Sequence, residues 1–325
     1  MERFNVVREE FRGQPAVKLI LPGITLVVLE NLLRIVHLGP NLERNLLYLD
    51  WDGKFKRDNW GLLGGHRIWF ALPGADESEV AYLPDAGPIT MEEQDDGSIV
   101  FTAPPDGMKL VKGFIIRPLR NSTVEVVNFV QNASDMLAAG AVWAITCTDP
   151  VANKAVYASR LNSGNQGWDS CQVALFPTWG GGHQTTAAGN AQFDITVDDG
   201  IGQWLQVLRP VGEEAKRAWW APFGGQVMAM PDMTLAKIAE VKPGMPYPIN
   251  GCNAAMYCGP WARTEDAGPA MVEMESMGPE VQLLPGDTTY HPEIISLATR
   301  AMDTANFGDM SVFNRPHIFE SLPRE

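Results

Sequence analysis

Short apolar runs separated by turn residues are the feature of this sequence that most constrains its fold. The runs are rich in Val, Ile, Leu, Phe and Thr, and several alternate apolar with polar residues. The 31 Gly and 24 Pro residues supply turns between them. The pattern predicts an all-β fold. We expect strands at Ala16–Leu21, Thr25–Leu29, Ile99–Ala103, Thr123–Val130, Ala139–Thr146, Gln192–Val197 and Trp204–Leu208.

Helical signals are few. Residues Leu29–Leu38 predict either a short helix or a bent strand, and Pro292–Ala301 predict one or two helical turns. The sequence has no βαβ rhythm and neither a GxGxxG nor a GxxxxGK(S/T) motif, which argues against a nucleotide-binding Rossmann or P-loop fold. We expect no cofactor, and we expect residues 1–325 to form one domain, since large β-sandwiches exceed 200 residues as single units.

Charge restricts the partners. The formal net charge is −14 and the isoelectric point is about 4.8, which argues against nucleic acid and anionic membrane surfaces. The longest apolar stretch, residues 16–29, is interrupted by Lys18, Pro22 and Gly23, and no basic region precedes an apolar run at the N-terminus. We therefore expect a cytoplasmic protein with a small-molecule ligand. Its oligomeric state is not encoded in any pattern we recognise.

The cysteines do not predict a metal site. Cys147, Cys171, Cys252 and Cys258 form no CxxC pair, and five residues separate the last two. The histidines show no HxH or HxxxH spacing. We expect four reduced thiols and no metal.

Four segments can be compared with known families. They are Asn59–Trp69, Val124–Ser134 leading into Ala141–Thr146, Tyr247–Asn253 followed by Met256 and Tyr257, and Val272–Pro279 followed by Leu284–Asp287. Together and in this order they resemble the galactose mutarotase-like superfamily, and they are closer to its aldose 1-epimerase-related branches than to the true aldose 1-epimerases. The resemblance implies a large antiparallel β-supersandwich with a sugar cleft on its concave face.

The sequence departs from the family pattern at one position. Aldose epimerases place a catalytic His just after the strand that ends in N-x-S, which here is Asn132-Ala133-Ser134. That region holds Trp143 and no His. The departure argues against simple mutarotase activity unless another residue supplies the acid.

Two carboxylates are candidates for the general base. Glu273 and Glu275 lie two apart in a predicted strand, so both side chains share one face. Paired carboxylates shift at least one pKa upward when buried, which suits a base. Alternatively, both face solvent on a polar strand face. The resemblance favours Glu275 as the essential carboxylate, and a different register would favour Glu273.

His66 and Arg67 follow two glycines. Adjacent strand residues point to opposite faces, so one of the two enters the cleft unless a bulge turns both inward. The resemblance favours Arg67, whose guanidinium suits sugar hydroxyls. His66 is then either a catalytic acid or a structural, hydrogen-bonded histidine.

Further candidates would contact the substrate, because aromatic faces stack on sugar rings and polar groups bind hydroxyls. His183 lies in a Gly-rich segment that could form a lid, or a plain surface loop. The predicted substrate-binding residues are Arg67, Trp69, Trp143, Trp179, His183, Asn253, Tyr257 and His291.

Three functions follow as hypotheses. The first is a carbohydrate epimerase or related isomerase or lyase, with Glu275 as base and His66 or His183 as acid. The second is a sugar-binding module without chemistry, since Trp143 stands where a catalytic His is expected. The third is a cleft that binds a hydrophobic metabolite instead of a sugar.

Overall fold

A computed structural model describes most of the chain. It covers residues 2–53, 56–57, 60–61, 63–73, 85, 87–120, 122–148, 155–159, 173–175, 204–208, 215–221, 224–259 and 271–299. The strands that carry the predicted site lie among them.

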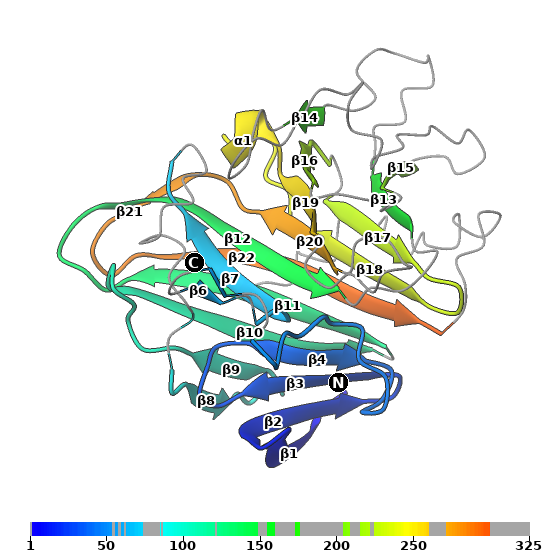
Figure 1. The fold of residues 1–325 in the computed structure, drawn as a ribbon. Helices are drawn as coiled ribbons and strands as arrows, with labels where there is room; N and C mark the ends of the chain where they lie inside the picture. The colour runs from blue at the N-terminus through cyan, green and yellow to red at the C-terminus, as the bar shows by residue number, and fades with distance from the viewer. Residues whose placement is uncertain are drawn as a thin grey trace.

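Within those residues, an eleven-stranded sheet forms one layer of the molecule (Figure 1). All its strand pairs are antiparallel, and β21 (Val281–Leu283) joins it by pairing with β12. In spatial order the other strands are β1 (Asn5–Phe11), β2 (Gln14–Leu21), β3 (Ile24–Leu29), β4 (Ile35–Gly39), β7 (His66–Ala71), β12 (Ala138–Thr148), β20 (Met271–Met277), β19 (Ala254–Gly259), β16 (Ala215–Trp219) and β14 (Val173–Leu175).

A nine-stranded antiparallel sheet forms the second layer, and Figure 1 shows β7, β12 and β20 crossing over β11 and β22. Three short elements belong to neither large sheet. They are β5 (Lys56–Arg57) and β6 (Trp60–Gly61), which pair with each other, and the helix α1 (Pro248–Gly251). In spatial order the second sheet contains β15 (Trp204–Leu208), β13 (Ala155–Ser159), β17 (Gly225–Ala229), β18 (Thr234–Ala239), β22 (Thr288–Ala298), β11 (Thr123–Asn132), β10 (Leu110–Arg120), β9 (Ile99–Thr102) and β8 (Thr90–Glu93).

The main hydrophobic core lies between the two sheets. Alternation along each strand sends apolar side chains such as Leu26, Ile68 and Met274 from the first sheet against Phe114 and Val126 from the second. A second buried cluster lies on the opposite face of the eleven-stranded sheet and contains Trp69, Trp143, Ile145 and Tyr257. We call the face toward the nine-stranded sheet the inner face and the opposite one the outer face.

Most strand predictions are confirmed. Six of the seven predicted runs coincide with β2, β3, β9, β11, β12 and β15, and Gln192–Val197 lies outside the described residues. Residues 29–38 are the end of β3, a bend and the start of β4, which matches the bent-strand alternative. No helix in the described part has the length and apolar character needed to cross a membrane.

The predicted helical turns at Pro292–Ala301 are wrong. Residues Thr288–Ala298 form β22, which pairs with β11 on one side and with β18 on the other. Two ladders of backbone hydrogen bonds outweigh the weak local helical signal, and the burial of both faces hides the alternation that would mark a strand.

Candidate functional site

Three neighbouring strands of the eleven-stranded sheet carry most of the predicted site. On β7, β12 and β20 the register is regular, with Arg67 beside Ile145 and Ile145 beside Glu275. Alternation therefore separates two groups of side chains. His66, Thr146, Met274 and Ser276 take the inner face, and Arg67, Trp69, Trp143, Glu273 and Glu275 take the outer face.

Both outer-face carboxylates are buried, so the alternative that they face solvent is wrong. Glu275 is 0% exposed and Glu273 is 6% exposed. The indole Nε1 of Trp143 donates a hydrogen bond of 2.8 Å to Glu275 Oε2. The ring of Trp143 also packs on Trp69, with ring centroids 4.8 Å apart. The carboxylate of Glu275 thus lies at the edge of an aromatic stack.

Glu273 is paired with a thiol. The Sγ of Cys147 donates to Glu273 Oε1 over 3.3 Å, and burial together with this carboxylate raises the pKa of Cys147 well above its ordinary value. Cys147 and Cys252 are buried and form no disulfide. Tyr257 lies beside Glu273 in the β19–β20 register and shares its face.

A cluster of buried ions lies next to this face. Arg34 forms an ion pair with Asp85, and the Nε of Arg67 lies 3.7 Å from Asp85 Oδ1. All three side chains are at most 5% exposed. Arg34 also donates to the carbonyl of Gly64 over 2.5 Å. Asp85 therefore balances two guanidinium groups and fixes the strand that carries Arg67.

No bulge follows the two glycines, so His66 and Arg67 point to opposite faces. Gly65 has φ +76°, and a Cβ there would lie 2.5 Å from the carbonyl oxygen of Ile35. The glycine lets the chain pass close to β4 before β7 begins. His66 then enters the space between the sheets.

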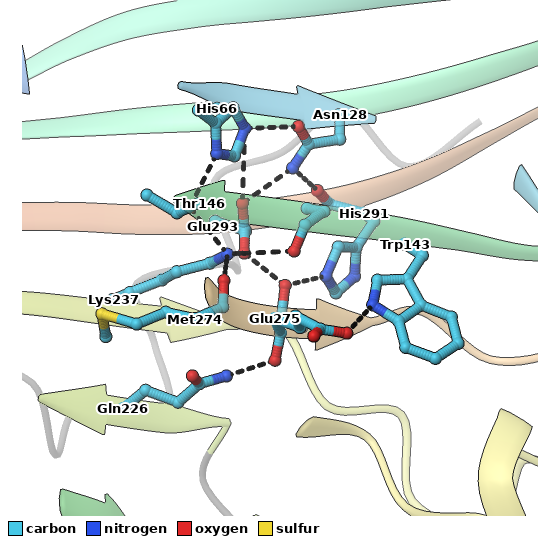
Figure 2. A network of polar contacts seen from close by, with 12 residues as sticks. His66, Asn128, Trp143, Thr146, Gln226, Lys237, Met274, Glu275, His291 and Glu293 are labelled. Atoms are coloured by element: carbon cyan, nitrogen blue, oxygen red, sulfur yellow. Dashed lines mark hydrogen bonds and ion pairs between the residues drawn. The ribbon is translucent and has the colours of Figure 1, made fainter. Parts of the chain in front are cut away.

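Figure 2 shows a network of polar side chains that joins the two sheets around His66. Nδ1 of His66 lies 2.8 Å from Thr146 Oγ1, and its Nε2 lies 3.1 Å from Asn128 Oδ1. Asn128 donates in turn to Glu293 Oε2 over 3.0 Å. Since the amide oxygen can only accept, the partners assign the proton of a neutral ring to Nε2.

Lys237 and Glu293 form the centre of this network. The Nζ of Lys237 lies 2.9 Å from Glu293 Oε1, and both side chains are at most 2% exposed. Ser276 hydrogen-bonds to Glu293 and lies 2.8 Å from His291 Nε2. The network is a buried ion pair flanked by two imidazoles.

Burial keeps both imidazoles neutral. It lowers the pKa of His66 and that of His291 to about 4, and the nearby Glu293 only partly offsets this. Burial raises the pKa of Glu293, but the charge of Lys237 and the hydrogen bond from Ser276 oppose it, and that pKa is lowered overall.

The remaining predicted residues have separate positions. The side-chain amide of Asn253 is used on the backbone of Ala221, accepting from its N–H at 2.7 Å and donating to its carbonyl at 2.8 Å. Trp179 and His183 lie outside the described residues. Among the described residues, no three His, Cys, Asp or Glu side chains come together as a metal site.

The turn after β11 has a structural role. Ser134 donates from its backbone N–H and its hydroxyl to Asn132 Oδ1, and the Asn132 amide donates to the carbonyls of Met136 and Leu283. The N-x-S motif thus ties β11 to β21.

Sequence reasoning missed the polar residues of the inter-sheet network. These are Asn128, Thr146, Gln226, Lys237, Ser276 and Glu293. A signal exists for one of them: Lys237 is the one charged residue in the otherwise uncharged and mostly apolar run Thr234–Ala239. A charged side chain in a strand that pairs with a neighbouring strand on each side must find its partners inside the protein.

Solved structures provide the comparison. No family model and no curated protein matches the sequence. A galactose mutarotase-like protein from Lactobacillus casei ATCC 334 superimposes with a TM-score of 0.55 and 10% identity, over 87% of this chain and 100% of that chain. A protein from Escherichia coli K12, provisionally assigned as an aldose 1-epimerase, gives a TM-score of 0.56 and 13% identity, over 87% of this chain and 98% of that chain.

A TPR-domain-containing protein from Parabacteroides distasonis ATCC 8503 also matches, with a TM-score of 0.58 and 12% identity. The match covers 90% of this chain, and the chain spans about half (48%) of that protein's length. At these identities the likeness concerns the fold. The two antiparallel sheets and these neighbours show that the chain has the galactose mutarotase-like fold predicted from its sequence.

Proposed function

We propose that this protein binds a sugar at the outer face of its eleven-stranded sheet and acts on it as an epimerase or a related isomerase or lyase. The observation that carries the proposal is the presence of Glu273, Glu275 and Arg67 on one face, next to stacked Trp69 and Trp143. The fold's neighbours include galactose mutarotase-like proteins, which supports a sugar as the ligand.

Glu275 is the proposed general base. A carboxylate can accept a proton from a sugar hydroxyl or ring carbon if it lies within hydrogen-bond reach of it. The bond from Trp143 fixes the orientation of the Glu275 carboxylate. Arg67 would bind substrate hydroxyls through its guanidinium, and the Trp69–Trp143 pair would pack against the ring.

The two imidazoles between the sheets are not the proposed general acid. His66 and His291 lie between the sheets, and the backbone of β12 and β20 separates them from the carboxylate of Glu275. We therefore assign both imidazoles to the inter-sheet network in this proposal. His183 and Tyr257 remain candidates for donating a proton.

The test is Glu275→Gln, with anomer interconversion followed by NMR across a panel of aldoses. A general base contributes about 10²–10⁴-fold, so the variant should lose at least 100-fold of the rate. Glu92→Gln, on exposed β8, is the control and should keep the wild-type rate. If the wild type itself equals the uncatalysed rate on every sugar, the assigned reaction is wrong.

A sugar-binding module without chemistry is the second candidate. The observation that favours it is the hydrogen bond from Trp143 to Glu275. Trp143 stands in the region where the family has a catalytic His, and its indole already occupies one oxygen of the proposed base. Calorimetry separates the two functions. Binding of a sugar that stays unchanged in the NMR assay supports the module, and turnover excludes it.

A further inference from the structure

We propose that Lys237 and Gln226, from the nine-stranded sheet, are positioning residues for Glu275 and its partner Trp143. The inference rests on the proposed function for its catalytic consequence. Its structural part stands on contacts between the sheets, and no substrate is needed to test it.

Lys237 binds the backbone directly behind the Trp143–Glu275 pair. Its Nζ donates to the carbonyl of Ala144 over 3.2 Å and to the carbonyl of Met274 over 3.1 Å. Ala144 follows Trp143 in β12, and Met274 precedes Glu275 in β20. One ammonium group therefore holds together the two strands whose outer-face side chains bond to each other.

Gln226 adds a second attachment. Its Nε2 donates to the carbonyl of Glu275 over 2.5 Å, and the side chain is 0% exposed (Figure 2). Gln226 is the Cα partner of Lys237 in the β17–β18 ladder, so the two side chains leave the nine-stranded sheet side by side. Two successive backbone carbonyls of β20, those of Met274 and Glu275, thus accept hydrogen bonds from side chains of the nine-stranded sheet.

Stability alone does not account for this arrangement. Replacing a buried ion pair with apolar side chains is often neutral or stabilising, because the desolvation of two charges offsets their attraction. The ammonium of Lys237 has four acceptors within 3.2 Å, and three of them belong to the eleven-stranded sheet. Lys237 therefore links β18 of the nine-stranded sheet to β12 and β20 of the eleven-stranded sheet.

The test observes Trp143 by NMR in protein carrying ¹⁵N-indole tryptophan. Trp143→Phe assigns the Nε1–H signal among the ten tryptophans. In Lys237→Met and in Gln226→Leu this signal should move by more than its linewidth, because the strands behind the Trp143–Glu275 bond are released. Lys112→Met is the matched control, since Lys112 is also buried and pairs with Asp106 in a different part of the sheet.

The double variant Lys237→Met/Glu293→Gln separates positioning from stability. It removes both charges of the buried pair. Its free energy of unfolding should therefore be closer to the wild-type value than that of Lys237→Met, while the Trp143 signal stays displaced. A signal that returns to its wild-type position together with stability overturns the proposal. A displacement of equal size in Lys112→Met also overturns it. Gln226→Leu changes no charge and decides the matter if neither charge variant folds.

The catalytic consequence is measured separately. If a sugar is turned over, Gln226→Leu should lower kcat by about 100-fold, the order expected for a base misplaced by an ångström. Its KM should change by less than its kcat. If no sugar is turned over, the proposed function fails, and the Trp143 signal still decides whether the two residues position Glu275.

Discussion

Trp143 and Glu275 are diagonal neighbours, not direct partners, in the β12–β20 ladder. The Cα partner of Trp143 is Met277, and that of Glu275 is Ile145, yet the indole Nε1 reaches Glu275 Oε2 at 2.8 Å. A long aromatic side chain can span this diagonal. The geometry leaves the second carboxylate oxygen, Oε1, away from the indole.

Trp143→Phe should destabilise the protein more than Trp219→Phe. Both changes shorten a buried tryptophan, but the first also removes a donor to a buried carboxylate, which costs about 1–3 kcal/mol. Trp219 Nε1 has no hydrogen-bond partner among the described residues, which makes Trp219→Phe a matched control. Chemical denaturation measures the difference. Equal losses in the two variants would mean that the indole bond contributes nothing.

Asp85→Asn should cost about 3–5 kcal/mol of unfolding free energy, since it leaves Arg34 and Arg67 buried without their shared counter-charge. Asp232→Asn is the comparison, because the Arg44–Asp232 pair is exposed and screened by solvent. That variant should unfold at nearly the wild-type denaturant concentration. A small effect of Asp85→Asn would show that the two arginines find other anions.

Stability should fall as the pH drops from about 6.5 to about 4. In the unfolded chain His66 and His291 take up protons near pH 6.5, while in the folded protein their pKa is about 4. The unfolded state then binds more protons, so acid favours unfolding, by on the order of 3 kcal/mol per imidazole. Glu293, whose pKa is lowered from 4.5, adds a loss in the same direction below that pH.

Denaturant titrations at several pH values across this window measure the slope. A variant with Gln at both His66 and His291 should lose most of it. A wild-type midpoint that does not change over the window contradicts the buried, neutral state of the imidazoles.

The buried thiols should resist modification in the native protein. Cys147 and Cys252 are both 0% exposed, and the raised pKa of Cys147 keeps it protonated. A variant with Ser at Cys171 and Cys258 should therefore react with a thiol reagent at mildly alkaline pH only after unfolding. Rapid labelling of both thiols before unfolding would show that the outer face opens to solvent.

The sequence predicts the architecture well because its strands are short and bounded by strong turn residues. Runs such as Thr123–Val130 and Ala139–Thr146 fall within β11 and β12. Period-two alternation also places Glu273 and Glu275 on one face correctly. The prediction that fails is that of helical turns at Pro292–Ala301. Burial on both faces of β22 removes the alternation of apolar and polar residues, and the local preference for helix or strand is ambiguous.

The inter-sheet network could not be read from the sequence in the same way. His66 and Glu293 are more than 200 residues apart, and only the packing of two sheets brings their side chains within 3.9 Å. Alternation shows that His66 and Arg67 diverge, but it does not show which of the two faces the second sheet. That choice depends on which face of β7 is covered, and this is a property of the whole fold.

The order of strands in the nine-stranded sheet also constrains how the chain folds. The last described strand, β22, lies between β11 and β18. Its residue Ser296 pairs with Thr123 of β11, which lies far earlier in the sequence. A ribosome must release the chain through β22 before β11 and β18 can be joined in this sheet. Such long-range pairing slows folding and leaves the edges of β11 and β18 exposed until β22 inserts. The chain is thus most exposed to aggregation while it awaits the strand that also supplies Glu293.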